Sequence, residues 1–196
     1  MKRRDFISLI GGAAAAWPLA AAAQQRERMR RIGLLLRGAA DDPESLARVG
    51  ALLQGLQELG WTDGRNVQLE YRWGSADAER IRKSAAELVA LAPDVILVSG
   101  NSGMAPLHRA TRTVPIVFVN TSDPVGGGFA TSLARPGGNA TGFSSIEYGM
   151  SGKWLELLKQ ISPGVTRAAV LRDPSIPSGS GQLGAIQAVG PFLAGC

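Results

Sequence analysis

The segment "PDVILVSGNSGMAPLHRATRTVPIVFVN", Pro93–Asn120, contains the pattern that decides the fold class. Two short apolar runs, "PDVILVSG" and "PIVFVN", flank the stretch "GMAPLHRATRT". Apolar runs of this length are typical of strands buried on both faces, and the stretch between them is predicted to form a short helix. A strand, a helix and a second strand in this order make a βαβ unit, which predicts a parallel sheet.

Strand patterns continue on both sides of this unit. "RIGLLLR" (Arg31–Arg37) is a buried run, whereas "NVQLEYRW" (66–73) alternates apolar and polar residues, as expected of a strand at or near a sheet edge. "ATGFSS" (140–145) is predicted to be a fifth strand, and "VTRAAVLRDP" (165–174) a sixth. The expected fold class is therefore α/β, a parallel sheet with helices on both faces.

Helical patterns occupy the intervals between these strands. Residues 43–60 place leucines at steps of three and four and end at Gly60, and a second helix is predicted after an N-cap at Asp77. Shorter helices are expected in "VGGGFATSLAR" (125–135) and "GQLGAIQAVG" (181–190), and a longer one in "MSGKWLELLKQISPG" (150–164). One strand and one helix after residue 164 cannot bury a second core, so we expect a shortened version of a longer design.

The first 23 residues, "MKRRDFISLIGGAAAAWPLAAAA", have the organisation of an export signal. A charged start precedes an apolar stretch, and Ala21-Ala22-Ala23 fits a small-residue cleavage site. The pair Arg3-Arg4 is similar to a twin-arginine signal, which predicts export to the periplasm. An uncleaved anchor is the alternative interpretation.

Composition excludes several classes of protein. The 196 residues carry a formal charge of +5, without a basic run interleaved with aromatics, so a nucleic-acid partner is not expected. The single cysteine, Cys196, cannot form an internal disulfide, and no metal-ligand spacing is present. His108 has no acidic or thiol neighbour in the sequence, which is typical of a surface or structural histidine.

The glycine-rich stretch "SDPVGGGFATSLARPGGNATG" (Ser122–Gly142) does not match a nucleotide loop. Thr131 stands where G-x-G-x-x-G requires its last glycine, and Trp154 follows Gly152-Lys153 where a P-loop requires Ser or Thr. "SGNSGM" likewise fails the G-x-S-x-G pattern of serine hydrolases at Met104.

Small and polar residues follow two neighbouring strands, in the loops 99–103 and 120–123. Ligands of open α/β sheets bind beyond the carboxyl ends of the strands, where helix N-termini present free N–H groups. A carboxylate is favoured beside those groups, and Asp123 would attract an ammonium. The pattern predicts binding of a small zwitterion such as an amino acid.

The segments "PIVFVNTSDPVGGGFATSLARPGGNATGFSS", "LLQGLQELGWTDGRNVQLEYRWGSADAERIRKSAAELVALAPDVILVSG" and "GQLGAIQAVGP" resemble ABC-transporter substrate-binding proteins of the tryptophan/phenylalanine-binding type. The resemblance covers nearly all of residues 28–193. It implies a type I periplasmic-binding-protein fold, with two α/β lobes, a ligand in the cleft between them and a membrane permease as partner. It implies neither catalysis nor a cofactor.

Carried onto this sequence, the resemblance implies ligand-facing residues in three loops: Asn101, Ser102, Gly103, Thr121, Ser122, Asp123, Phe143 and Ser144. Alternatives remain for three of them. Asp123 before Pro124 is also an N-cap pattern, Ser102 could cap its own helix, and Phe143 could pack in the core.

The expected organisation is a signal at 1–23, an N-terminal lobe at 28–146, a linking helix at 147–164 and the start of a second lobe at 165–196. Two other functions stay open at this point. One is an enzyme on a doubly wound fold, with Asp123 or His108 as a base, and the other is a sensory binding protein without a transport role.

Overall fold

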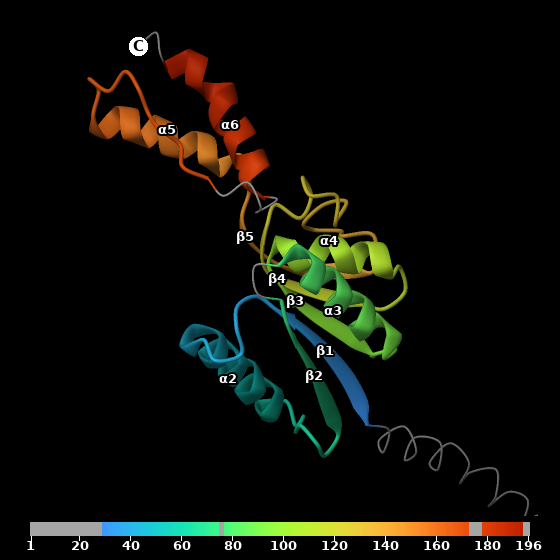
Figure 1. Ribbon diagram of the computed structural model, residues 1–196. Helices are drawn as coiled ribbons and strands as arrows, with labels where there is room; N and C mark the ends of the chain where they lie inside the picture. The colour runs from blue at the N-terminus through green and yellow to red at the C-terminus, as the bar shows by residue number, and fades with distance from the viewer. Residues whose placement is uncertain (1–28, 75–76, 173–177, 194–196) are drawn as a thin grey trace, which may run out of the picture.

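The computed structural model describes residues 29–74, 77–172 and 178–193 (Figure 1). The signal predicted at residues 1–23 lies outside the described residues. In chain order the elements are β1 (Arg30–Leu36), α2 (Pro43–Glu58), β2 (Val67–Trp73), α3 (Ala78–Ala90), β3 (Val95–Ser99), α4 (Asn101–Ala110), β4 (Ile116–Ser122), β5 (Ala140–Ile146), α5 (Met150–Ile161) and α6 (Ser178–Leu193).

The strands of the described residues form one parallel sheet in the order β2-β1-β3-β4-β5. Helix α2 covers one face, and α3 and α4 cover the other (Figure 1). The predicted α/β fold class is therefore confirmed. Strand β2, whose alternating sequence predicted an edge position, is indeed an outer strand, because polar side chains are tolerated where one face meets solvent.

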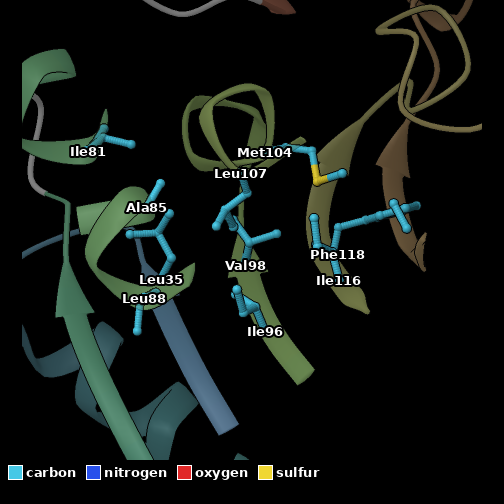
Figure 2. Close-up of a cluster of buried hydrophobic side chains, with 11 residues drawn as sticks. Leu35, Ile81, Ala85, Leu88, Ile96, Val98, Met104, Leu107, Ile116 and Phe118 are labelled. Carbon is cyan, nitrogen blue, oxygen red and sulfur yellow. The ribbon is translucent and has the colours of Figure 1, made fainter. Parts of the chain in front are cut away.

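The main core lies between the sheet and the pair α3 and α4. Figure 2 shows the apolar side chains of both helices turned toward β1, β3 and β4. Its fully buried members include Leu88 on α3, Leu107 on α4, and Ile96 and Ile116 on the central strands. Complete burial of such a side chain stabilises the fold by about 1.5–3 kcal/mol, so this layer fixes the position of α4.

The opposite face has a smaller core beneath α2. Leu34, Val67 and Leu69 are buried there, while Leu52 and Leu56 of α2 are only partly covered. Alternate residues of β1 thus serve different layers, Leu34 facing α2 and Leu35 facing α3.

Local signals in the sequence set the helix ends. The carboxylates of Asp42 and Asp77 accept backbone N–H bonds from the first turns of α2 and α3, as predicted for Asp77. Helix α2 ends beside Gly60, whose φ of +83° is the left-handed conformation that glycine adopts freely after a helix.

Two predicted elements are wrong. Residues 125–128 form a turn and 129–135 an irregular segment rather than a short helix, because Gly128 takes a φ of +72° and the amides of Phe129 and Ala130 both bond to the Pro124 carbonyl. The described part of the sixth predicted strand, 165–172, forms no strand in this structure. A β-strand needs a neighbouring strand to which its backbone can hydrogen-bond. The amino-acid pattern alone does not show whether such a neighbour is present.

Helices α5 and α6 pack against each other beyond the carboxyl end of the sheet (Figure 1). Gly152 allows the close approach, since a Cβ there would lie 3.3 Å from Cγ1 of Val189. No helix among the described residues has both the length and the apolar character needed to cross a membrane.

Candidate ligand-binding site

The loops that follow β3 and β4 are joined by one side chain, that of Asn101. Its Nδ2 donates to the Ser122 carbonyl at 2.7 Å, and its Oδ1 accepts from the Ser122 amide at 2.8 Å. Asn101 is 8 % exposed, so both bonds are largely shielded from water. Asn101 thus joins the first two of the three predicted loops and is the residue that positions them.

The first turn of α4 opens at this edge of the sheet. Its N-cap is Gly100, which has a φ of +84° and no side chain to bond the free N–H groups of the helix. The Gly100 amide itself donates to the Val119 carbonyl at 3.0 Å. Uncapped N–H groups and the helix dipole together favour a negative charge at this position.

The next two predicted residues differ in their surroundings. Ser102 is half-buried and makes no side-chain cap bond, so its predicted cap role is not observed. Gly103 is buried, and a Cβ there would lie 2.7 Å from Cγ2 of Val98. Packing against the sheet therefore requires glycine at position 103.

Asp123 lies directly after β4 and has a φ of +42°. Its Oδ1 accepts from the Gly126 amide at 2.6 Å, and its Oδ2 accepts from the Tyr148 amide at 3.3 Å. The predicted capping role is therefore observed, although what it caps is a turn instead of a helix. Burial, and secondly the Asp123 carboxylate, raise the pKa of the Tyr148 hydroxyl.

The remaining predicted residues lie where β4 meets β5. Thr121 is fully buried, and its hydroxyl has no hydrogen-bond partner within the described residues. Ser144 pairs with Thr121 in the sheet, and its Oγ donates to the Thr121 carbonyl at 3.1 Å. Phe143 is 75 % exposed, so the alternative that it packs in the core is wrong. Ligand contact by any of the predicted residues stays a prediction.

The loop after β1 also reaches this edge, although it was not among the loops predicted to bind a ligand. The Ser45 hydroxyl donates to the Arg37 carbonyl at 3.3 Å, and the Ser45 amide donates to Oδ2 of Asp42 at 2.9 Å. The Arg37 side chain lies across Gly100, with Cδ 3.8 Å from the position of a Cβ on that glycine. The rule that selected the loops after β3 and β4 applies equally to Arg37, the first residue after β1.

The Asp42 cap predicts how the stability of this loop depends on pH. Interaction with the Ser45 hydroxyl, and then with its backbone amide, holds the pKa of Asp42 below its usual value of 3.8. A lowered folded-state pKa means that the contribution is complete above the unfolded pKa and is lost as the pH falls through the folded one. An Asp42→Asn protein should therefore be less stable than the wild type at neutral pH, with the gap closing in acid.

Urea unfolding at about pH 7, 5 and 3 measures this gap. The control is Asp41→Asn, which removes the same charge from an exposed neighbour. A gap that stayed constant across the pH range would contradict the role assigned to the carboxylate.

The acidic and histidine side chains of the described residues do not form a metal centre. No group of three or more His, Cys, Asp or Glu side chains gathers there. His108 lies in the last turn of α4, far from the first turn at the carboxyl edge, with its ring edge-on to Phe129 and beside Arg112. Burial, and secondly the Arg112 charge, lower the pKa of His108.

Known proteins resemble this chain in sequence and in fold. A family model described as "ABC transporter substrate binding protein" matches residues 39–183. A curated relative, the "Tyrosine-binding protein" of Clostridioides difficile (strain R20291), is 29% identical over 120 residues, which are 61% of this chain and 34% of the relative.

Solved structures show the same fold. The structure described as an ABC domain in complex with L-Trp from Streptococcus pneumonia has a TM-score of 0.70 at 23% identity, over 85% of this chain and 55% of that one. A conserved domain protein from Vibrio cholerae has a TM-score of 0.68 at 26% identity, over 86% and 54%. The chain spans about half the length of these structures and a third of the curated relative.

Proposed function

Since this chain belongs to the ABC transporter substrate-binding protein family, we propose that it binds an amino acid, without catalysis, as the solute-binding component of an ABC importer. The observation that carries the proposal is the pair of hydrogen bonds between Asn101 and Ser122. They hold the uncapped first turn of α4 and the Asp123 loop side by side at the carboxyl edge of the sheet.

The two loops offer opposite charges to the ends of an amino acid. The free N–H groups at the start of α4, near Ser102, would donate hydrogen bonds to the α-carboxylate, and Asp123 would attract the α-ammonium. The exposed ring of Phe143, with Ser144 beside it, would contact the side chain of the ligand. An aromatic ligand is supported by the printed names of the relatives, a tyrosine-binding protein and a complex with L-Trp.

We also propose where the protein acts and which protein is its partner. Residues 1–23 would direct export by the twin-arginine route to the periplasm, where an ABC permease is the partner. Residues 28–146 would form the N-terminal lobe, 147–164 the linking helix and 165–196 the start of a second lobe, with the ligand between the lobes.

Thermal unfolding with L-tyrosine, L-tryptophan and L-phenylalanine tests the proposal. A ligand at 100 times its Kd stabilises the folded state by about 2.7 kcal/mol, which raises Tm by roughly 5–10 °C for a chain of this size. Tyramine, which lacks the carboxylate, should give no shift. Asp123→Asn should abolish the shift with the amino acids, whereas Glu58→Gln, at the far end of α2, should preserve it.

The same samples reveal whether the ligand is consumed. Chromatography after incubation should recover each amino acid unchanged. Turnover of a ligand, or the absence of a shift with every amino acid, would contradict the proposed function.

A further inference from the structure

A hollow lies on the face of the sheet beneath α2. It has a volume of about 200 Å³, and its lining includes the last residues of β1, β2 and β3, on the face that α3 and α4 do not cover. Its apolar wall is made by α2 and by strands β1 to β4 and consists of Leu36, Val49, Leu52, Trp73, Leu97 and Val119. Drug-sized ligands occupy pockets of about 300–1,000 Å³, so this hollow suits a smaller body, such as one aromatic ring with a short tail.

The polar part of the lining is cationic. Arg37 and Arg48 contribute guanidinium groups, Ser45 and Ser99 contribute hydroxyls, and none of the described residues that line the hollow carries a carboxylate. Arg48 is paired with Glu44 on the exposed side of α2. The Arg37 guanidinium forms no ion pair within the described part of the chain. The hydrogen bond from the Ser45 hydroxyl to the Arg37 carbonyl holds the backbone of Arg37 in place.

This lining differs in charge from the edge near α4. An amino acid needs an acidic partner for its ammonium group. Asp123 is such a partner near α4, whereas the described residues that line the hollow include none. A guanidinium group recognises a carboxylate through two parallel hydrogen bonds, and aromatic walls favour a flat apolar body. The hollow therefore matches an anion without an ammonium group.

We propose that the hollow beneath α2 binds a small aromatic monocarboxylate, with its carboxylate on Arg37 and its ring against Trp73 and Leu52. This site differs from the amino-acid site proposed above, because its apolar wall lies on the face of the sheet beneath α2 and it does not use Asp123, although Arg37 reaches Gly100 at the edge that the two sites share. It gives the chain a second class of ligand, aromatic acids that carry no amine.

Isothermal titration calorimetry with phenylacetate tests this site. The wild-type chain should bind phenylacetate and should bind neither phenethylamine, which has the opposite charge, nor acetate, which has no ring. Arg37→Gln should weaken phenylacetate binding at least tenfold, since it removes a charge-assisted pair. The matched control is Arg65→Gln, an exposed arginine in the connection between α2 and β2.

Two more variants separate this site from the one near α4. Leu52→Trp should fill the hollow and abolish phenylacetate binding, whereas Leu59→Trp, at an exposed position just after α2, should have no effect. Asp123→Asn should leave phenylacetate binding intact while it abolishes amino-acid binding. Circular dichroism checks that each variant is folded.

Three results would contradict the proposed aromatic-acid site. Absence of phenylacetate binding, or binding unchanged by Arg37→Gln and Leu52→Trp, overturns it whatever the result with amino acids. Loss of phenylacetate binding in Asp123→Asn also overturns it, because the acid would then occupy the edge near α4.

Discussion

The free energy of unfolding of an Asn101→Asp protein is expected to be about 3 kcal/mol lower than that of the wild type at neutral pH. The substitution keeps the shape of the side chain but replaces Nδ2, which donates to the Ser122 carbonyl at 2.7 Å, with an oxygen. Two acceptors would then face each other at a site where the side chain is 8 % exposed. The buried carboxylate and the unpaired carbonyl both penalise the folded state.

Urea unfolding at pH 7 measures this loss, and a matched variant gives the control. Asn120→Asp makes the same chemical change two residues before Ser122, at an exposed position in the same edge. Its stability should stay within about 0.5 kcal/mol of the wild type. Equal stabilities of the two variants would mean that the Asn101 bonds do not hold the loops together.

The second large effect is expected from Gly142→Ala on β5. Gly142 pairs with Phe118 of β4, and a Cβ at this position would overlap the Phe118 carbonyl oxygen. A backbone atom cannot rotate away as the end of a side chain can, so β5 must separate from β4. We expect a loss of about 2–4 kcal/mol, comparable to other severe packing errors.

Hydrogen exchange locates this damage. Amides of β5 and the neighbouring amides of β4 should lose protection in Gly142→Ala, while those of β1 and β3 retain it. The control is Gly138→Ala, where a Cβ meets no atom within 4 Å and the change should be neutral or stabilising by up to about 1 kcal/mol. Unchanged protection of β5 would contradict the steric argument.

The sequence predicted most of the sheet because its signals are local. The alternation in β2 and the caps at Asp77 and Gly60 depend on a few neighbouring residues, and all three interpretations are confirmed. The helix predicted at 125–135 is wrong for a related reason. Gly128 takes a φ of +72°, a left-handed conformation that interrupts a helix and that glycine adopts freely.

The sixth strand and the details of the site could not be predicted in the same way. A strand at 165–172 depends on a neighbouring strand, and a single chain pattern does not say whether one is present. For Asn101, the sequence shows a polar residue after β3, but the partner of its amide lies 21 residues away. The sequence therefore indicated a polar edge without showing that Asn101 bonds Ser122.

The Asp123 carboxylate has a further consequence for the segment that leads into α5. Its two oxygens hold the Gly126 and Tyr148 amides, and Tyr148 stands just before α5. A cationic ligand that binds the Asp123 carboxylate competes with those two amides. Ligand binding and the hydrogen bond from Tyr148 to Asp123 are therefore energetically coupled. Solute binding would then weaken the hydrogen bond at Tyr148 and free the main chain two residues before the start of α5.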